Sequence, residues 1–281
     1  MTRLLAAVLA CVMATVALAG CPAPQVLAQQ AGLTVAGRDT KRLDTRQALL
    51  ALPGVRNLTI PDPVYRRTMT YRAVPLTAIL KGVAIDADDY VQARATDDFS
   101  VAIPARLLLF DDPARAEAFL AIEDAAAPWP RIPGKPYSAG PFYIVWKLAP
   151  SVSVSSEYWA YRLAALAVTD SPTKRWPVLA VGPEIGPDDP IRMGLDRFVS
   201  VCMACHRFDG AGEGEQGPDL ARPMNPVDYF QLPALKKLIR DPASVRQWAD
   251  QKMPGFDAAT LSDRDIDAIV AWLSYKARRQ R

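Results

Sequence analysis

The sequence predicts an α+β protein, with a first domain that contains strands and a second domain that is small and all-α, and several observations support this. Residues 90–95, 99–103 and 142–148 are rich in the alternating or clustered apolar residues typical of strands. Five prolines lie between residues 171 and 190, which indicates a stiff linker between two domains. Apolar residues recur at helical spacing after Pro190 and again near the C-terminus. A chain of 281 residues is long enough for about two domains.

The composition is that of a globular protein and argues against a nucleic-acid binder. Half of the residues are hydrophobic, the net charge is only +3, and no run of basic residues stands out. We therefore expect no nucleic-acid partner. Proline is frequent, with 25 residues, which favours short elements joined by ordered loops.

Residues 1–20 have the pattern of an export signal, with Arg3 followed by a short apolar stretch. The sequence Leu18-Ala19-Gly20-Cys21 resembles the cleavage box of bacterial lipoproteins, which implies that Cys21 becomes a lipidated first residue. Ordinary cleavage after Ala19 or Ala28 is the alternative. Residues 21–32 would then form a tether. These features predict a periplasmic protein of bacteria, anchored to a membrane by lipid.

In the first domain, which we place at residues 33–170, local signals predict a series of short elements. Asp44 or Thr45 is positioned to cap a short helix. Pro75 opens a second short helix, and Gly82 follows as its stop. The other predicted elements are, in order, a strand at 64–73, a hairpin of strands 90–95 and 99–103 that turns at 96–98, a helical turn at 104–109, a loop at 125–141, and strands at 142–148 and 158–168, although residues 163–166 alone also suit a helix.

Residues 171–189 form the predicted linker, and residues 190–281 the second domain. Its first helix begins after Pro190, and Gly194 and Phe198 precede Cys202 at four-residue steps. A glycine-rich loop at 210–217 and a helical run at 232–239 follow. The last helix has a capping box made by Ser262 and Asp265, and an apolar stripe that contains Ile266, Ile269, Val270 and Leu273.

The segment Cys202-Met203-Ala204-Cys205-His206 has the Cys-x-x-Cys-His spacing of a c-type haem attachment site. Two thiols one helical turn apart can add to the two haem vinyl groups, and the next residue then lies on the same face, where its imidazole can bind the iron. The single motif predicts one covalent haem c.

Two other uses of a Cys-x-x-Cys pair fit less well. A zinc site lacks ligands, because His206 is the only histidine and the other cysteines, Cys11 and Cys21, lie in the export segment and at its end. A thioredoxin-like redox pair follows a strand, and no strand is predicted before Cys202.

The haem motif, the glycine-rich loop, Gly217-Pro218-Asp219-Leu220 and Met253-Pro254-Gly255-Phe256 together resemble the class I cytochrome c domain, over roughly residues 188–281. This resemblance implies that His206 is the proximal iron ligand and Met253 the distal one. It also implies that the Pro218 carbonyl accepts the other imidazole N–H, and that the last helix crosses the first near Gly194, with Trp272 at the contact.

One other methionine is a candidate for the distal iron ligand. The iron needs a sixth ligand, and the chain has no second histidine. Met193 and Met203 are too close to the haem motif in sequence to reach the opposite face. Met224 remains an alternative, but Met253 lies further along the chain and before a stiffening proline.

The first domain resembles the molybdopterin-binding domain of the sulfite oxidase family, which implies a mixed-sheet α+β fold. The resemblance covers roughly residues 33–170, and it is carried by Tyr71-Arg72-Ala73-Val74-Pro75-Leu76, Asp97-Asp98-Phe99 and the segment from Ala139 to Val145. That family binds molybdenum through a cysteine thiolate, whereas residues 31–182 contain neither cysteine nor histidine. We therefore expect no molybdenum cofactor, and we interpret the domain as a docking module. Arg66, Arg67 and Arg72 could hold a phosphate, but solvated strand charges explain them better.

Three functions remain open at this point. The first is a membrane-tethered electron-transfer protein that exchanges electrons with a periplasmic redox protein or dehydrogenase, and it requires only the haem. The second is an oxidoreductase whose substrate binds the first domain, with Asp97, Asp98 and Glu123 as available carboxylates. The third is a haem-based sensor or assembly factor without turnover, which would favour an iron with an open coordination site, and the distal Met253 argues against it. We favour an electron-transfer protein over an enzyme.

Overall fold

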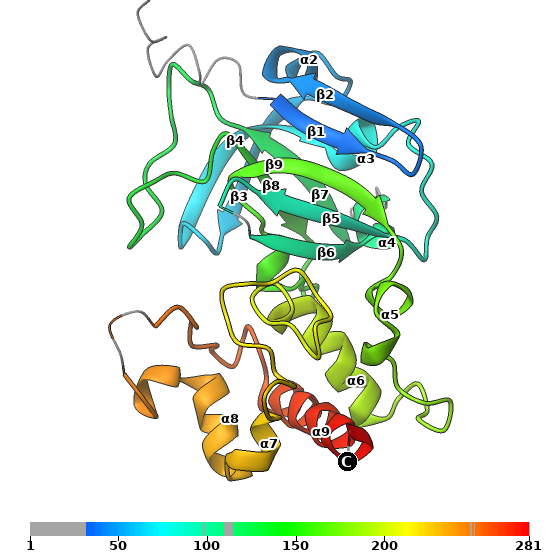
Figure 1. Cartoon of the computed structure of the whole chain (residues 1–281). Coiled ribbons are helices and arrows are strands. Elements are labelled where there is room, and N and C mark those ends of the chain that lie inside the picture. The colour runs from blue at the N-terminus through cyan, green and yellow to red at the C-terminus, as the bar shows by residue number, and fades with distance from the viewer. Residues whose placement is uncertain (1–31, 98, 110–114, 248, 250, 281) are drawn as a thin grey trace, which may run out of the picture.

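The computed structural model describes residues 32–97, 99–109, 115–247, 249 and 251–280. Two β-sheets occupy the N-terminal part, and the C-terminal part is mostly helical (Figure 1). The α+β prediction is confirmed. The predicted export signal, the lipidation site Cys21 and almost the whole tether lie outside the described residues.

The first sheet has five strands in the order β2-β1-β9-β5-β6. Strand β1 pairs in parallel with β9, and the other neighbours are antiparallel. The edge strand β6 lies nearest the helical part (Figure 1). The bounds are β1 Gly32–Ala36, β2 Lys41–Thr45, β5 Tyr90–Ala95, β6 Ser100–Pro104 and β9 Leu163–Thr169.

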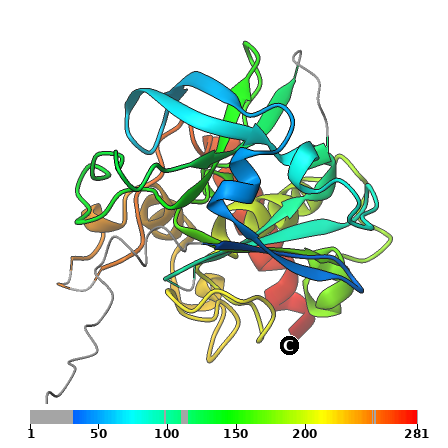
Figure 2. The ribbon, with the colours of Figure 1, turned by 90° about the horizontal axis from the view of Figure 1, so that it is seen from above.

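The second sheet is antiparallel throughout, in the order β3-β4-β7-β8. All seven residues of β7 are buried, which places this strand at the centre of the N-terminal core. Seen from above, the strands lie over helices α6 and α9 (Figure 2). The bounds are β3 Arg56–Asp62, β4 Arg67–Pro75, β7 Ala116–Ile122 and β8 Phe142–Leu148, with short helices α2 Arg46–Leu50, α3 Leu76–Ile79, α4 Ala105–Leu109 and η1 Ser156–Tyr158 between strands of the two sheets.

Several predicted elements of the first domain are confirmed, with shifts that have local causes. Thr45 caps α2 by accepting a hydrogen bond from the Ala48 N–H at 3.2 Å. The strand predicted at 64–73 begins later, because Arg66 adopts a left-handed conformation in the turn from β3. The strand predicted at 158–168 begins at Leu163, since Arg162 also has a positive φ angle. Arg66, Arg67 and Arg72 are exposed, in accord with solvated charges.

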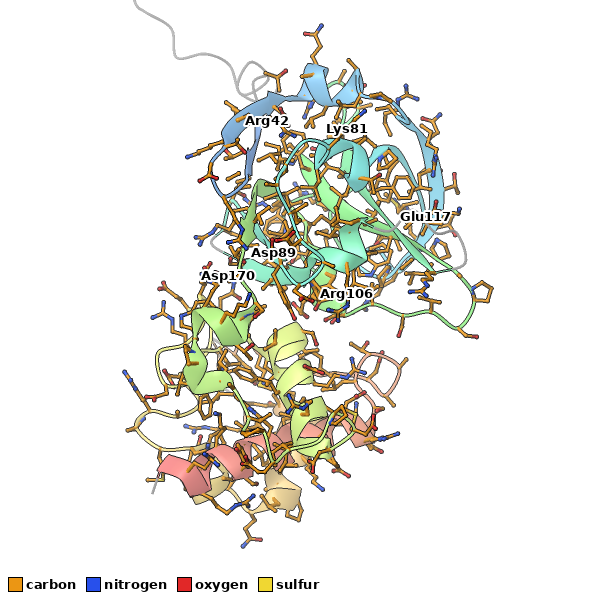
Figure 3. The ribbon with its side chains drawn as sticks, turned by 90° about the vertical axis from the view of Figure 1, so that its right-hand side faces the viewer. Arg42, Lys81, Asp89, Arg106, Glu117 and Asp170 are labelled. Carbon is orange, nitrogen blue, oxygen red and sulfur yellow. The ribbon has the colours of Figure 1, made fainter. Side chains whose placement is uncertain are left out.

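The segment predicted as a linker carries structure of its own. It contains α5 Pro172–Arg175 and η2 Pro177–Leu179, and Leu179 is fully buried in the core of the helical part. Lys276 donates a hydrogen bond to the Ala180 carbonyl at 2.6 Å. At the top of this segment, Asp170 lies near Asp89 (Figure 3), and Arg38 forms ion pairs with both.

The helical part packs α6 Pro190–Arg197 against the long C-terminal helix α9 Asp263–Gln280. The capping box predicted for α9 is confirmed, because Ser262 Oγ accepts from the Asp265 N–H at 3.2 Å and Asp265 Oδ2 accepts from the Ser262 N–H at 3.0 Å. The remaining helices are η3 Phe198–Cys202, α7 Pro226–Tyr229, α8 Leu232–Arg240 and η4 Pro242–Ser244. Within the described residues, no helix has the length and apolar character needed to cross a membrane.

Candidate haem-binding site

The Cys-x-x-Cys-His segment follows directly from the first helix of the C-terminal part. Asp189 caps α6 by accepting from the Ile191 N–H at 2.8 Å, and the helix continues into the π-helical turn η3. Both the Cys205 and the His206 N–H groups then donate to the Cys202 carbonyl, at 3.1 and 2.9 Å. The two cysteines are therefore one turn apart, as thioether attachment to one haem requires.

The two cysteines are partly buried and are not joined by a disulfide. Burial, reinforced by the nearby Glu157 carboxylate, raises the pKa of Cys202 to about 12 and that of Cys205 to about 11. Such thiols stay protonated at neutral pH, unlike the low-pKa cysteines of redox pairs. No group of three or more histidine, cysteine, aspartate or glutamate side chains that could hold a metal ion lies among the described residues.

The His206 ring is held in one orientation by the loop that follows it. Its Nδ1 atom lies 2.8 Å from the Pro218 carbonyl oxygen. A carbonyl only accepts hydrogen bonds, so Nδ1 must donate, and the lone pair is left on Nε2. Burial lowers the pKa of His206 although the Pro218 carbonyl opposes this effect, which favours the neutral form that binds iron.

Two glycines let this loop approach the haem motif closely. A Cβ atom at Gly217 would lie 2.4 Å from Cε1 of His206, and one at Gly214 would lie 2.5 Å from the carbonyl carbon of Cys205. The Gly217 N–H donates to the Cys205 carbonyl at 2.9 Å. The glycines of the sequence pattern are thus needed for close packing around His206, and the donor set fits a covalent haem c.

The sequence alone assigns no role to Asp219, although this residue belongs to the Gly-Pro-Asp-Leu sequence. Its carboxylate accepts from the N–H groups of Asp209, Gly210 and Ala221, at 2.8, 2.7 and 2.8 Å. These contacts close the loop on both sides of Pro218. The spacing of Asp219 from the haem motif was the only sequence signal that this residue closes the loop.

Met253 and Met224 differ in their surroundings. Met253 is partly buried and packs against the core of the helical part, whereas the Met224 side chain is 51% exposed. Arg240, at the end of α8, donates to the carbonyls of Phe256 and Leu261, at 2.5 and 2.6 Å, and so holds the segment that follows Met253. Sequence reasoning missed Arg240, because its partners are distant in sequence.

The predicted crossing of the first and last helices is confirmed. A Cβ atom at Gly194 would lie 1.9 Å from the Ala268 carbonyl oxygen, so the two backbones touch. The Phe198 and Trp272 rings stack with centroids 4.5 Å apart. Phe208 contacts both rings, at 6.2 and 4.8 Å.

The first domain contacts the haem motif itself. Ala204, which lies between the two cysteines, is 3% exposed and belongs to the core of the sheet domain. Ser155 Oγ donates to the Ser200 carbonyl at 2.6 Å. Glu157 follows on the same short segment, and its carboxylate contributes to the raised pKa of both cysteines. The haem motif is therefore in contact with both domains.

A comparison with protein families agrees with this geometry. Residues 194–276 match the cytochrome c family, a range that includes both cysteines, His206, Pro218 and Met253. The chain therefore contains a cytochrome c domain, and the family implies covalent haem c and suggests an electron-transfer role. No family match supports the sulfite-oxidase-like interpretation of the first domain. No curated protein matches the chain.

Proposed function

We propose that this protein is a periplasmic, lipid-tethered monohaem cytochrome that passes single electrons between a redox partner and its haem. The observation that carries this proposal is the Cys-x-x-Cys-His turn with His206 Nδ1 bonded to the Pro218 carbonyl. Bound haem c would supply a one-electron iron couple, and His/Met ligation would give it a comparatively high reduction potential.

Each residue of the site has a separate role in this proposal. Cys202 and Cys205 provide the sulfurs for the two thioether bonds, and His206 presents Nε2 to the iron. The Pro218 carbonyl keeps the imidazole in the correct tautomer and orientation. Met253 provides the sixth ligand, and Cys21 carries the lipid.

We assign the first domain a docking role, on a fold like that of the sulfite oxidase family but without its metal. Two of its buried acidic side chains are bonded within the fold, which fits a structural role. Asp62 Oδ2 accepts from the Tyr71 hydroxyl at 2.6 Å, and Glu117 forms an ion pair with Lys147 at 2.6 Å. Metal analysis of the purified protein should find about one equivalent of iron per chain and no molybdenum. Stoichiometric molybdenum would contradict this assignment.

One cavity supports a second candidate, an oxidoreductase with its substrate in the first domain. A space of about 210 Å³ is lined by Arg106, Arg115 and Ser153, together with apolar residues. Arg106 lies at the edge of the sheet domain that faces the helical part (Figure 3). The Glu123 carboxylate gives this oxidoreductase less support. It already accepts hydrogen bonds from the Trp129 N–H and the Ser138 hydroxyl, at 2.9 and 2.7 Å.

Stopped-flow spectroscopy separates the two candidates. The oxidised protein is mixed with reduced periplasmic dehydrogenases or, separately, with small-molecule reductants. An electron-transfer protein should be reduced quickly by a protein donor, and its rate should fall with salt if docking is electrostatic. Saturable reduction by a small molecule, lost in Arg106→Ala, would favour the oxidoreductase instead.

A further inference from the structure

Glu213, in the glycine-rich loop after the haem motif, is bonded to the first domain and the segment that follows it. Its Oε2 atom accepts from Arg94 Nη2 at 2.6 Å and from Ser100 Oγ at 3.0 Å, and its Oε1 atom accepts from Arg175. The Glu213 side chain is 18% exposed, so this carboxylate is largely withdrawn from solvent. A partly buried carboxylate with two guanidinium partners is a stronger contact than an exposed surface pair.

The partners of Glu213 are themselves fixed in place. Arg94 and Ser100 face each other across the β5–β6 hairpin. Buried Gln92 donates to Ser100 Oγ at 2.6 Å and accepts from Arg175 Nη1 at 3.3 Å. The Arg175 guanidinium also stacks on the Trp176 ring at 4.0 Å. Glu213 therefore binds a hydrogen-bonded part of the sheet domain and the structured segment that leaves it.

The loop that carries Glu213 is also the loop that orients His206. Gly214, the next residue, packs on the backbone of Cys205, and Gly217 packs on the imidazole. Pro218 then accepts from His206 Nδ1 at 2.8 Å. These groups are already in close contact. A movement of the loop at Glu213 would therefore displace the His206 ring.

We propose that Glu213 is a positioning residue, through which the first domain holds the loop that orients the axial histidine. This inference rests on the proposed haem function. It makes the first domain part of the haem environment, since loosening the Glu213 contacts weakens the Pro218–His206 hydrogen bond. A weaker hydrogen bond makes the imidazole a less basic ligand and raises the reduction potential.

Two variants of the holoprotein separate positioning from a simple charge effect. Glu213→Gln removes a negative charge, whereas Arg94→Gln removes a positive charge from the same contact. The readout is the exchange of two loop amides, because the Gly217 and Leu220 N–H groups donate to the Cys205 and Arg207 carbonyls, at 2.9 and 2.8 Å. Both variants should speed this exchange by about tenfold or more, because the charge-assisted hydrogen bond that holds the loop is lost. Both should also raise the haem potential and move the haem-methyl NMR shifts in the same direction.

The matched control is Glu215→Gln, on the same loop. Glu215 forms an ion pair with Arg207 but is 74% exposed, so its loss should leave exchange, potential and NMR shifts as in the wild type. Unchanged exchange in Glu213→Gln and Arg94→Gln, with potentials that move in opposite directions, would overturn the positioning role in favour of a charge effect. Covalent haem in all variants, checked on denaturing gels, tests the proposed haem function separately.

Discussion

Gly194 of α6 packs directly on the Ala268 carbonyl of α9, where a Cβ atom at position 194 would lie 1.9 Å from the oxygen. This contact lets the Phe198 and Trp272 rings stack one turn further along. Because the neighbouring group is backbone, it cannot move aside as a flexible side chain can. The size of residue 194 therefore sets how closely the first and last helices approach.

Gly194→Val should destabilise the holoprotein by at least about 1–3 kcal/mol, the usual cost of overpacking. Chemical denaturation followed by haem absorbance and far-ultraviolet circular dichroism measures this cost. Gly186→Ala is the control, because a Cβ there meets nothing within 4 Å. Equal stability of Gly194→Val and the wild type would show that the two helices do not touch at this point.

Asp219 should make the haem loop sensitive to acid. Burial by itself would raise the pKa of this carboxyl, but three backbone N–H donors and the nearby Arg222 together lower it below the ordinary value of 3.8. A lowered pKa stabilises the folded state above the unfolded value, and this stability is lost as the pH falls through the folded pKa.

We therefore expect the wild type to lose stability below about pH 4, and Asp219→Asn to lose less over that range. At pH 7 the variant should be less stable by about 2 kcal/mol, since an amide oxygen replaces a charged acceptor. Urea titrations at pH 7 and pH 3 measure both effects. A variant with the same acid slope as the wild type would assign that slope to other carboxylates.

Replacing Cys202 and Cys205 together by serine should abolish covalent haem, because both thioethers need a sulfur. Denaturing electrophoresis with haem staining checks this. The Arg207→Gln variant keeps the motif and should stain as the wild type does. Haem that stays with the double variant under denaturing conditions would contradict the attachment site.

Met253→Ala should remove the weak near-infrared band that methionine–iron ligation gives in the oxidised protein. Met224→Ala should keep this band, because the Met224 side chain is 51% exposed whereas Met253 packs against the core. Near-infrared absorption of both oxidised variants decides between the two residues. The reverse result would give the sixth position to Met224.

Elements with local signals were predicted well from the sequence. Thr45 caps α2, Pro75 precedes α3, and Ser262 with Asp265 begins α9. Each of these features depends on residues within one turn of one another, so a short stretch of sequence contains all the information needed. The β5–β6 hairpin was predicted correctly for the same reason.

Strands without a local signal were missed. Strand β7, Ala-Glu-Ala-Phe-Leu-Ala-Ile, is buried along its whole length, so it lacks the alternation of a half-exposed strand. Its alanines and glutamate are also poor strand formers in isolation. Pairing with β4 and β8 on its two sides determines its conformation, and neither partner is adjacent in sequence. Strands β1, β2 and β3 were missed too, and β1 pairs with β9 from the far end of the domain.

The sequence by itself determined the chemistry of the haem motif, because the spacing of Cys202, Cys205 and His206 within one helical segment is sufficient for it. Only the tertiary structure decided what surrounds that motif. Glu213, Arg240 and Ser155 are ordinary polar residues in the sequence, and their roles arise from partners that folding brings close. Local spacing sets which bonds a segment can form, whereas long-range packing sets which groups face it.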